Sequence, residues 1–142
     1  MKKLISISVF LVLVLSFFTV GVVSAEKNAS AKGLKTEKVE VLYFHFTRRC
    51  VTCQAVEAES KKAIEALYPT QMKTGKITFA SVNLDDKKSK ALAERCKAEG
   101  QALLVISGTK RVDLTDQGFM YARSKPEKLK VELKRVIDPM LK

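Results

Sequence analysis

The sequence predicts a single α/β domain with a four-stranded mixed sheet, and three observations predict it. An almost continuously apolar run, Val39–Phe46, is typical of a central strand covered on both faces. A second strand pattern, Ile77–Leu84, follows a helical pattern, so these two strands are expected to pair in parallel. A third strand is expected at Leu103–Ile106 and a fourth at Arg111–Leu114. The turn residues Gly108-Thr109-Lys110 between them indicate an antiparallel hairpin.

The first helix is expected from about Val51 to Leu67. Thr47 is expected to cap its start. Tyr68-Pro69 is expected to end it, because the residue before a proline disfavours helical geometry. The apolar face of this helix consists of Cys53, Val56, Ser60, Ala63, Ile64 and Leu67.

Two further helices complete the order β-α-β-α-β-β-α. One spans about 88–97 and is expected to end before Gly100, a natural left-handed terminator. The last begins at Ser124-Lys125-Pro126-Glu127, which matches a capping box with proline in the first turn. Its apolar face consists of Leu129, Leu133, Val136, Ile137 and Met140.

The N-terminal residues have the layout of a secretory signal peptide. Lys2 and Lys3 precede an uncharged run, Leu4–Val23, and small residues allow cleavage after Ala25. The apolar run is also long enough to span a bilayer, so an uncleaved N-terminal anchor is the alternative. In either case the rest of the chain is expected outside the cytoplasm, in the periplasm or cell envelope.

Two segments are expected after residue 25. Residues 26–36 are polar and small and are typical of a linker, and residues 37–142 are long enough for one domain with a buried core. The chain has 26 Lys and Arg against 15 Asp and Glu, a net charge of +11, which suits nucleic acid, anionic lipid or acidic partners. Because no nucleic-acid motif is visible and the chain is expected to be exported, we favour a solvated basic surface and no nucleic-acid partner.

The chemistry is expected at Cys50-Val51-Thr52-Cys53, between the first strand and the first helix. A thiolate at Cys50 would be stabilised by unpaired backbone N–H groups, by the helix dipole, and by Arg48 and Arg49. The thiolate is the reacting form of cysteine. Cys53 lies one turn on, on the same face. We therefore interpret Cys50 as the attacking thiol and Cys53 as the resolving thiol.

Other interpretations of the cysteines stay open. A Cys-x-x-Cys is also half of a zinc site, but only Cys96 and His45 are left to complete four ligands. Cys96 can be a third redox thiol or a soft ligand, although a small buried hydrophobe is favoured. His45 can move protons for the thiols, or point away from them in a structural role, which is favoured.

At this point the chain resembles the thioredoxin superfamily over about Val39 to Leu141. The resemblance rests on the apolar strand running into Cys50–Cys53, the strand end Val82–Asp85, Gly100 before the third strand, and the final hairpin and helix. It implies a minimal thioredoxin-like fold that lacks the extra N-terminal strand and helix of full thioredoxins.

A narrower resemblance comes from Arg48–Cys53, Val112–Thr115 and Phe119–Arg123. These segments resemble the ArsF-like nitrophenyl compound nitroreductase subunit family of small exported bacterial proteins. That resemblance implies a link to the reduction of nitroaromatic arsenicals and to efflux permeases. No flavin or nucleotide fingerprint is visible, so no cofactor is expected, and electrons would come from a redox partner protein or a membrane donor.

The sequence departs from the thioredoxin pattern at three positions. Arg49 replaces a tryptophan, Phe44 replaces a buried aspartate, and Ala102 replaces a cis-proline in the loop that faces the dithiol. A cis bond without proline costs about 2.5–4 kcal/mol, so the Gln101–Ala102 bond is expected to be trans. Loss of the proline leaves room over the sulfurs, which keeps capture of a soft ion open.

Together these observations predict an exported thiol–disulfide oxidoreductase or electron carrier. The alternative is a thiol-based protein that binds a metal or arsenite through Cys50 and Cys53 and serves an efflux permease.

Overall fold

The computed structural model describes residues 37–142. The predicted signal peptide or anchor over residues 1–25 and the predicted linker over residues 26–36 lie outside the described residues. Within 37–142, none of the helices combines the length and the hydropathy needed to cross a membrane.

The four predicted strands form one mixed sheet in the order β2-β1-β3-β4, where the strands are β1 (Val39–His45), β2 (Ile77–Asn83), β3 (Ala102–Ser107) and β4 (Lys110–Asp113). β1 pairs with β2 in parallel and with β3 antiparallel, and β3 pairs antiparallel with β4. This confirms the predicted parallel pair followed by a hairpin. Gly108 in the hairpin turn has a φ of 56°, a conformation that glycine adopts without strain.

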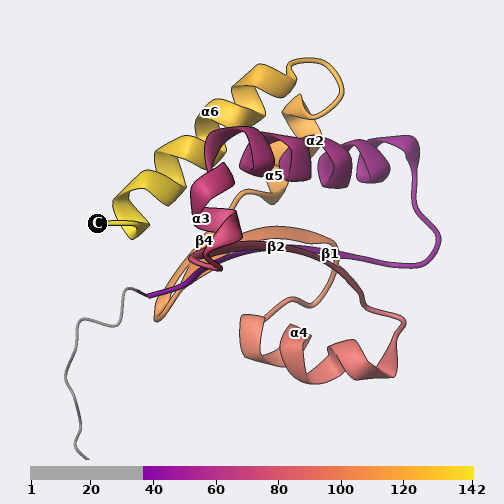
Figure 1. The fold of residues 1–142 in the computed structure, drawn as a ribbon. Helices are drawn as coiled ribbons and strands as arrows, with labels where there is room; N and C mark the ends of the chain where they lie inside the picture. Colours follow the sequence, from indigo (N-terminus) through magenta and orange to yellow (C-terminus); the bar gives the residue numbers. More distant parts are fainter. Residues whose placement is uncertain (1–36) are drawn as a thin grey trace, which may run out of the picture. The chain divides into compact units, whose positions relative to one another are not determined.

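The helices and single 3-10 turns are α2 (Val51–Leu67), α3 (Pro69–Lys73), η2 (Lys87–Ser89), α4 (Lys90–Cys96), α5 (Thr115–Tyr121), α6 (Pro126–Ile137) and η3 (Asp138–Met140). Figure 1 shows α2, α5 and α6 on one side of the sheet and α4 alone on the other. The described domain therefore has a small thioredoxin-like α/β fold, as predicted.

Two apolar clusters, one on each face, hold these layers together. Successive side chains of a strand point to opposite faces. Val39, Val41 and Tyr43 of β1 accordingly pack in the cluster that includes residues of α2 and α6, here called the α2-side cluster. Leu42 and Phe44 pack in a second cluster with residues of α4, here called the α4-side cluster. β1 is thus buried on both faces, as its continuous apolar run predicted.

Two short helices were not predicted. Pro69 does end the pattern of α2, but it also occupies the first turn of α3, where a missing N–H costs nothing. α5 begins after β4, where the Asp113 carboxylate accepts hydrogen bonds from the backbone N–H of Thr115, at 3.0 Å, and from its hydroxyl. Helices of five and seven residues are too short to produce a clear periodic pattern.

Three predicted helix caps are wrong. The N-cap of α2 is Cys50 and not Thr47. α4 ends at Cys96, and its C-cap Lys97 has a left-handed φ of 51°, so Gly100 is not the terminator. No capping box forms at α6, because the Ser124 hydroxyl donates to the Met120 carbonyl instead, at 3.2 Å; the proline in the first turn is confirmed.

Candidate functional site

Cys50 and Cys53 form a disulfide at the start of α2, with their Cα atoms 5.1 Å apart. Cys50 is the N-cap, and its sulfur accepts a hydrogen bond from the backbone N–H of Cys53 at 3.2 Å. Its carbonyl accepts the first helical hydrogen bond, from Gln54, at 3.1 Å. One N–H group that a helix N-terminus leaves unpaired therefore points at the Cys50 sulfur, which favours a negative charge there.

The two sulfurs differ in their access to solvent. Cys50 is exposed, whereas only 3% of Cys53 is accessible. Val51, the residue after Cys50, is exposed over 66% of its surface. An outside reagent can therefore reach Cys50 and not Cys53, and the roles of attacking and resolving thiol stay a prediction.

Hydrogen bonds from the end of β2 hold the loop that carries Cys50. The Thr47 backbone N–H donates to the Asp85 carboxylate at 2.7 Å, and the Asn83 amide donates to the Thr47 hydroxyl at 2.9 Å. The Leu84 backbone N–H donates to the His45 carbonyl at 2.7 Å. Hydrogen bonds from the backbone and side chain of Thr47 lower the pKa of Asp85. The loop is thus fixed to the neighbouring parallel strand.

The two arginines before Cys50 have different surroundings. Arg48 is exposed and makes no ion pair with any described residue. Arg49 forms an ion pair with Glu57 in the second turn of α2, and about a quarter of each side chain is accessible. Burial alone would raise the pKa of Glu57, but hydrogen bonds from Ser81 and Arg49 and the charge of Arg49 lower it overall. The charge of Arg49 is therefore offset, which the sequence did not reveal.

Tyr43 and His45 lie near enough to this ion pair for their charges to interact with it. Their rings stack with centroids 5.9 Å apart, so His45 is on the α2 side of the sheet. His45 Nδ1 lies 2.9 Å from the Phe46 carbonyl, and because a carbonyl only accepts, Nδ1 carries a proton. The Tyr43 hydroxyl is buried without a hydrogen-bond partner among the described residues. Burial raises the pKa of Tyr43, with Arg49 opposing and Glu57 reinforcing this shift.

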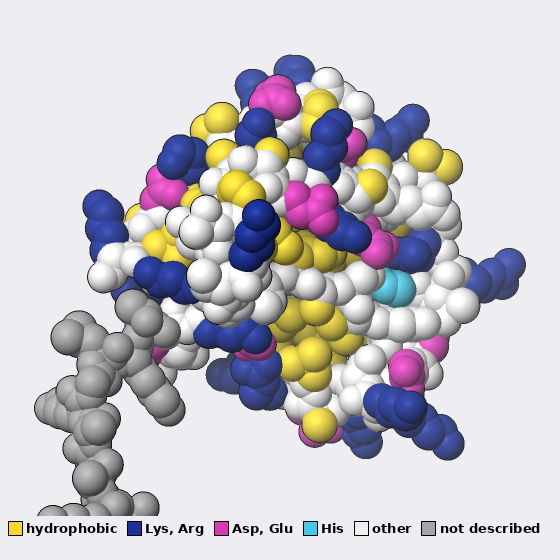
Figure 2. All heavy atoms as spheres, in the orientation of Figure 1, with side chains coloured by type: hydrophobic (Ala, Val, Ile, Leu, Met, Phe, Trp, Pro, Cys, Tyr) yellow, Lys and Arg dark blue, Asp and Glu magenta, His cyan; other side chains and the backbone are white. Residues whose placement is uncertain are grey.

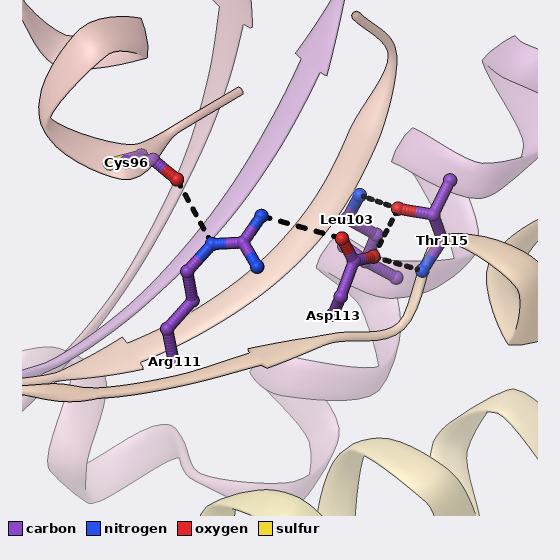
Figure 3. A network of polar contacts seen from close by, with 5 residues as sticks. All are labelled: Cys96, Leu103, Arg111, Asp113 and Thr115. Atoms are coloured by element: carbon purple, nitrogen blue, oxygen red, sulfur yellow. Dashed lines mark hydrogen bonds and ion pairs between the residues drawn. The ribbon is translucent and has the colours of Figure 1, made fainter. Parts of the chain in front are cut away.

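Cys96 lies on the opposite side of the sheet, in the α4-side cluster. Burial raises the pKa of its thiol. Its carbonyl accepts a hydrogen bond from Arg111 Nε at 3.0 Å, and Arg111 also contacts Asp113, which binds Thr115 (Figure 3). This network ties the end of α4 to β4 and α5. Cys96 is therefore a small buried residue of the core, which is the interpretation that the sequence favoured.

The cysteines and the histidine do not form a zinc site. Cys96 packs on the α4 side, whereas His45 stacks on Tyr43 on the α2 side, so the sheet separates two of the four ligands that sequence reasoning considered. No group of three or more His, Cys, Asp or Glu side chains within residues 37–142 is arranged to hold a metal ion.

The loop Gln101–Ala102 precedes β3. All peptide bonds of the described residues are trans, including the one between these two residues. Ala102 pairs with Phe44, and its side chain packs in the α4-side cluster. The Ala102 side chain therefore does not take the place of a proline ring over the dithiol. The approach of the loop backbone to the sulfurs stays a prediction.

Basic side chains do not gather in one patch on the face drawn in Figure 2, where lysines and arginines alternate with acidic groups. Hydrophobic atoms are visible between the helical layer and α4 on the same face. The net charge of the chain therefore does not mark an anion site on this face.

Sequence reasoning missed Glu57 as a member of the site. The signal was present, because Glu57 lies four residues after Cys53, at the spacing that brings helical side chains together. Its pairing with Arg49 depends on how the loop folds back over α2, which spacing alone does not give.

Comparisons with known proteins add little. No protein-family model matches the chain, and no curated protein matches it. A solved structure described as "Structure of a malarial protein" aligns over 70% of this chain and 97% of its own length, at 19% identity and a TM-score of 0.45. This similarity is too weak to support any inference about function.

Proposed function

We propose that this chain is an exported thioredoxin-like thiol–disulfide oxidoreductase or electron carrier that works through Cys50 and Cys53. One observation carries the proposal: the exposed Cys50 is bonded to the buried Cys53 at the N-terminus of α2. Such surroundings favour a thiolate at the accessible sulfur and keep the second sulfur for the intramolecular step.

The proposed reaction consists of two successive thiol–disulfide exchange steps. In the reduced chain the Cys50 thiolate attacks one sulfur of a partner disulfide; a mixed disulfide forms, and the partner's other sulfur leaves as a thiolate and takes up a proton. Cys53 then loses its proton and attacks Cys50, which releases the partner's second thiolate. That thiolate also takes up a proton. Two electrons have then passed to the partner, one of the two protons comes from Cys53 and the other from solvent, because Cys50 had already lost its proton, and the Cys50–Cys53 disulfide is formed.

The reduced dithiol has to be regenerated by a second exchange, with a redox partner protein or a membrane electron donor. Val51, the apolar and exposed residue after Cys50, gives such a partner a surface to contact. The resemblance to the ArsF-like family extends the proposal to electron supply for a nitroreductase of nitroaromatic arsenicals, near an efflux permease. Location outside the cytoplasm follows from the predicted signal peptide.

Trapping tests the proposal. Cys53→Ser should accumulate a mixed disulfide through Cys50 with partner proteins in cells, seen as reducible bands on non-reducing gels. Cys50→Ser and the double variant are the matched controls and should show none. Absence of trapped species, with Cys50 still reactive toward alkylating agents, would contradict the proposal. Tight one-to-one arsenite binding without any disulfide exchange would favour the soft-ion carrier instead.

A further inference from the structure

Glu57 lies on the same side of α2 as the buried sulfur of the dithiol. It follows Cys53 by four residues, a spacing that returns to the same side of an α-helix, and Cys53 is bonded to Cys50 at the helix N-terminus. A carboxylate in that position raises the free energy of a thiolate, because like charges disfavour the charged form. A redox helix would be expected to avoid such a group.

Arg49 compensates this charge directly. Its guanidinium is bound to the Glu57 carboxylate, although the two residues are separated by the whole first turn of α2. Ser81 of β2 also lowers the pKa of Glu57. The pair lies close to the buried Tyr43, whose pKa burial raises, with both charges also contributing. Since about three quarters of each side chain is removed from water, solvent screens this pair less than it screens a surface pair.

Arg48 provides the contrast. It is exposed and has no ion-pair partner among residues 37–142, so its charge is screened by water and salt. Of the two arginines that precede Cys50, only Arg49 is therefore held in a fixed place relative to the sulfurs.

We propose that the Arg49–Glu57 ion pair sets the acidity of the Cys50 thiol, with Glu57 as a positioning residue that holds and offsets the charge of Arg49. The inference rests on the proposed function, because it concerns the regulation of the same dithiol. It predicts that the pKa of Cys50 shifts in opposite directions when the charge of one partner or of the other is removed. Loss of the Glu57 charge leaves Arg49 uncompensated and makes Cys50 more acidic, and loss of the Arg49 charge leaves Glu57 uncompensated and makes Cys50 less acidic.

The test uses Cys53→Ser as the parent, so that only Cys50 reacts at the site. The pKa of Cys50 is obtained from the pH dependence of alkylation by iodoacetamide, followed by mass spectrometry of the Cys50 peptide. Glu57→Gln should lower it by roughly 0.3–1 pH unit and Arg49→Gln should raise it by a similar amount. The double variant should lie within about 0.3 unit of the parent, and Arg49→Lys, which keeps the charge, should lie between the parent and Arg49→Gln.

Glu59→Gln is the matched control. It removes the same charge from the same helix, but six residues from Cys53 and therefore on another face. Its effect on the pKa of Cys50 should stay below about 0.2 unit. A merely structural ion pair predicts that Glu57→Gln and Arg49→Gln lower the melting temperature alike and do not shift the pKa in opposite directions. An unchanged or raised pKa in Glu57→Gln overturns the inference.

A second measurement separates this inference from the proposed function. In the chain with both thiols, Glu57→Gln should shift the equilibrium with glutathione toward the reduced dithiol, because a stabilised thiolate makes a couple more oxidising. If the unaltered chain exchanges with disulfides and the opposite pKa shifts are absent, only the tuning role fails. If the unaltered chain exchanges with no disulfide, the proposed function fails, while the pKa series still reports on the ion pair.

Discussion

The two sides of the sheet hold cysteines in opposite surroundings. On the α2 side, Cys50 and Cys53 lie at a helix N-terminus, close to an ion pair and a fixed loop. On the α4 side, Cys96 is enclosed by apolar side chains, and burial raises the pKa of its thiol. The comparison teaches that position in the fold, and not residue type, decides which of three cysteines in one short domain is available for chemistry.

The largest expected effect is a difference in the rate of disulfide reduction between a cysteine substitution on the α2 side and one on the α4 side. Cys50→Ser should reduce the rate of reduction of a small-molecule disulfide by at least about a hundredfold, because the attacking thiolate is lost. Cys96→Ala should keep the rate within about twofold, since it removes a small buried hydrophobe on the other face. Both are measured with the fully reduced chain by following thiol release. An equal loss in Cys96→Ala would show that the comparison between the two faces is wrong.

Alkylation sharpens the comparison without any substitution. In the reduced native chain near neutral pH, iodoacetamide should label Cys50 at least about tenfold faster than Cys96, because Cys96 is buried and its pKa is raised. Peptide mapping by mass spectrometry measures the labelling of each cysteine. In concentrated guanidinium chloride the difference should disappear. Persistence of the difference in the unfolded chain would mean that local sequence, and not the fold, causes it.

The next prediction concerns the packing of α5 against α2, on the α2 side of the sheet. A Cβ at Gly118 of α5 would lie 3.0 Å from Val56 Cγ1 and 3.4 Å from Leu103 Cδ2, so α5 approaches α2 closely. Gly118→Val should therefore cost about 1–3 kcal/mol in the free energy of unfolding, measured by urea denaturation. Gly100→Ala is the control, because nothing lies within 4 Å of its Cβ. A cost in Gly100→Ala equal to that in Gly118→Val would contradict this reason.

The elements that the sequence predicted well are those with long or strong patterns. α2 has the predicted bounds because seventeen residues carry a clear helical period, and β1 follows from an uninterrupted apolar run. The caps were predicted poorly, because Thr47 and Ser124 each form a different hydrogen bond that depends on the folded surroundings. Short helices such as α3 and α5 depend on one proline and one carboxylate, and leave little periodicity.

The candidate site likewise contains features that could be predicted from the sequence and features that could not. The spacing of Cys50 and Cys53 is local, so their meeting at the start of a helix could be predicted from the sequence. The partner of Arg49 could not, because the guanidinium folds back over α2 to Glu57. The side of the sheet on which His45 lies depends on where β1 begins, since a shift of one residue reverses every side chain of a strand. Both facts required the structure.

The smallest expected effect concerns the loop before Cys50. Asp85 accepts the Thr47 backbone N–H at 2.7 Å, and these contacts lower the pKa of Asp85. Because the pKa is lowered in the folded chain, the carboxylate stabilises the loop at pH values above the usual range of an aspartate, near 4, and this contribution is lost as the pH falls through the lowered value. Asp85→Ala should therefore lower the protection of the Thr47 amide against hydrogen exchange several-fold near neutral pH. In the unaltered chain the same protection, expressed relative to the exchange rate of an unfolded amide at the same pH, should fall in acid.

Asp86→Ala is the matched control for that loop. The Asp86 carboxylate accepts the Lys88 backbone N–H at 2.9 Å, and so caps η2 and does not hold the loop. It should leave the Thr47 amide unchanged in nuclear magnetic resonance measurements of exchange. Disulfide exchange by Asp85→Ala should fall by less than about threefold, because the helix N-terminus still faces Cys50. If the Thr47 amide exchanges at the same rate with and without Asp85, the hydrogen bond from β2 does not fix the loop, and the orientation of Cys50 depends on the helix alone.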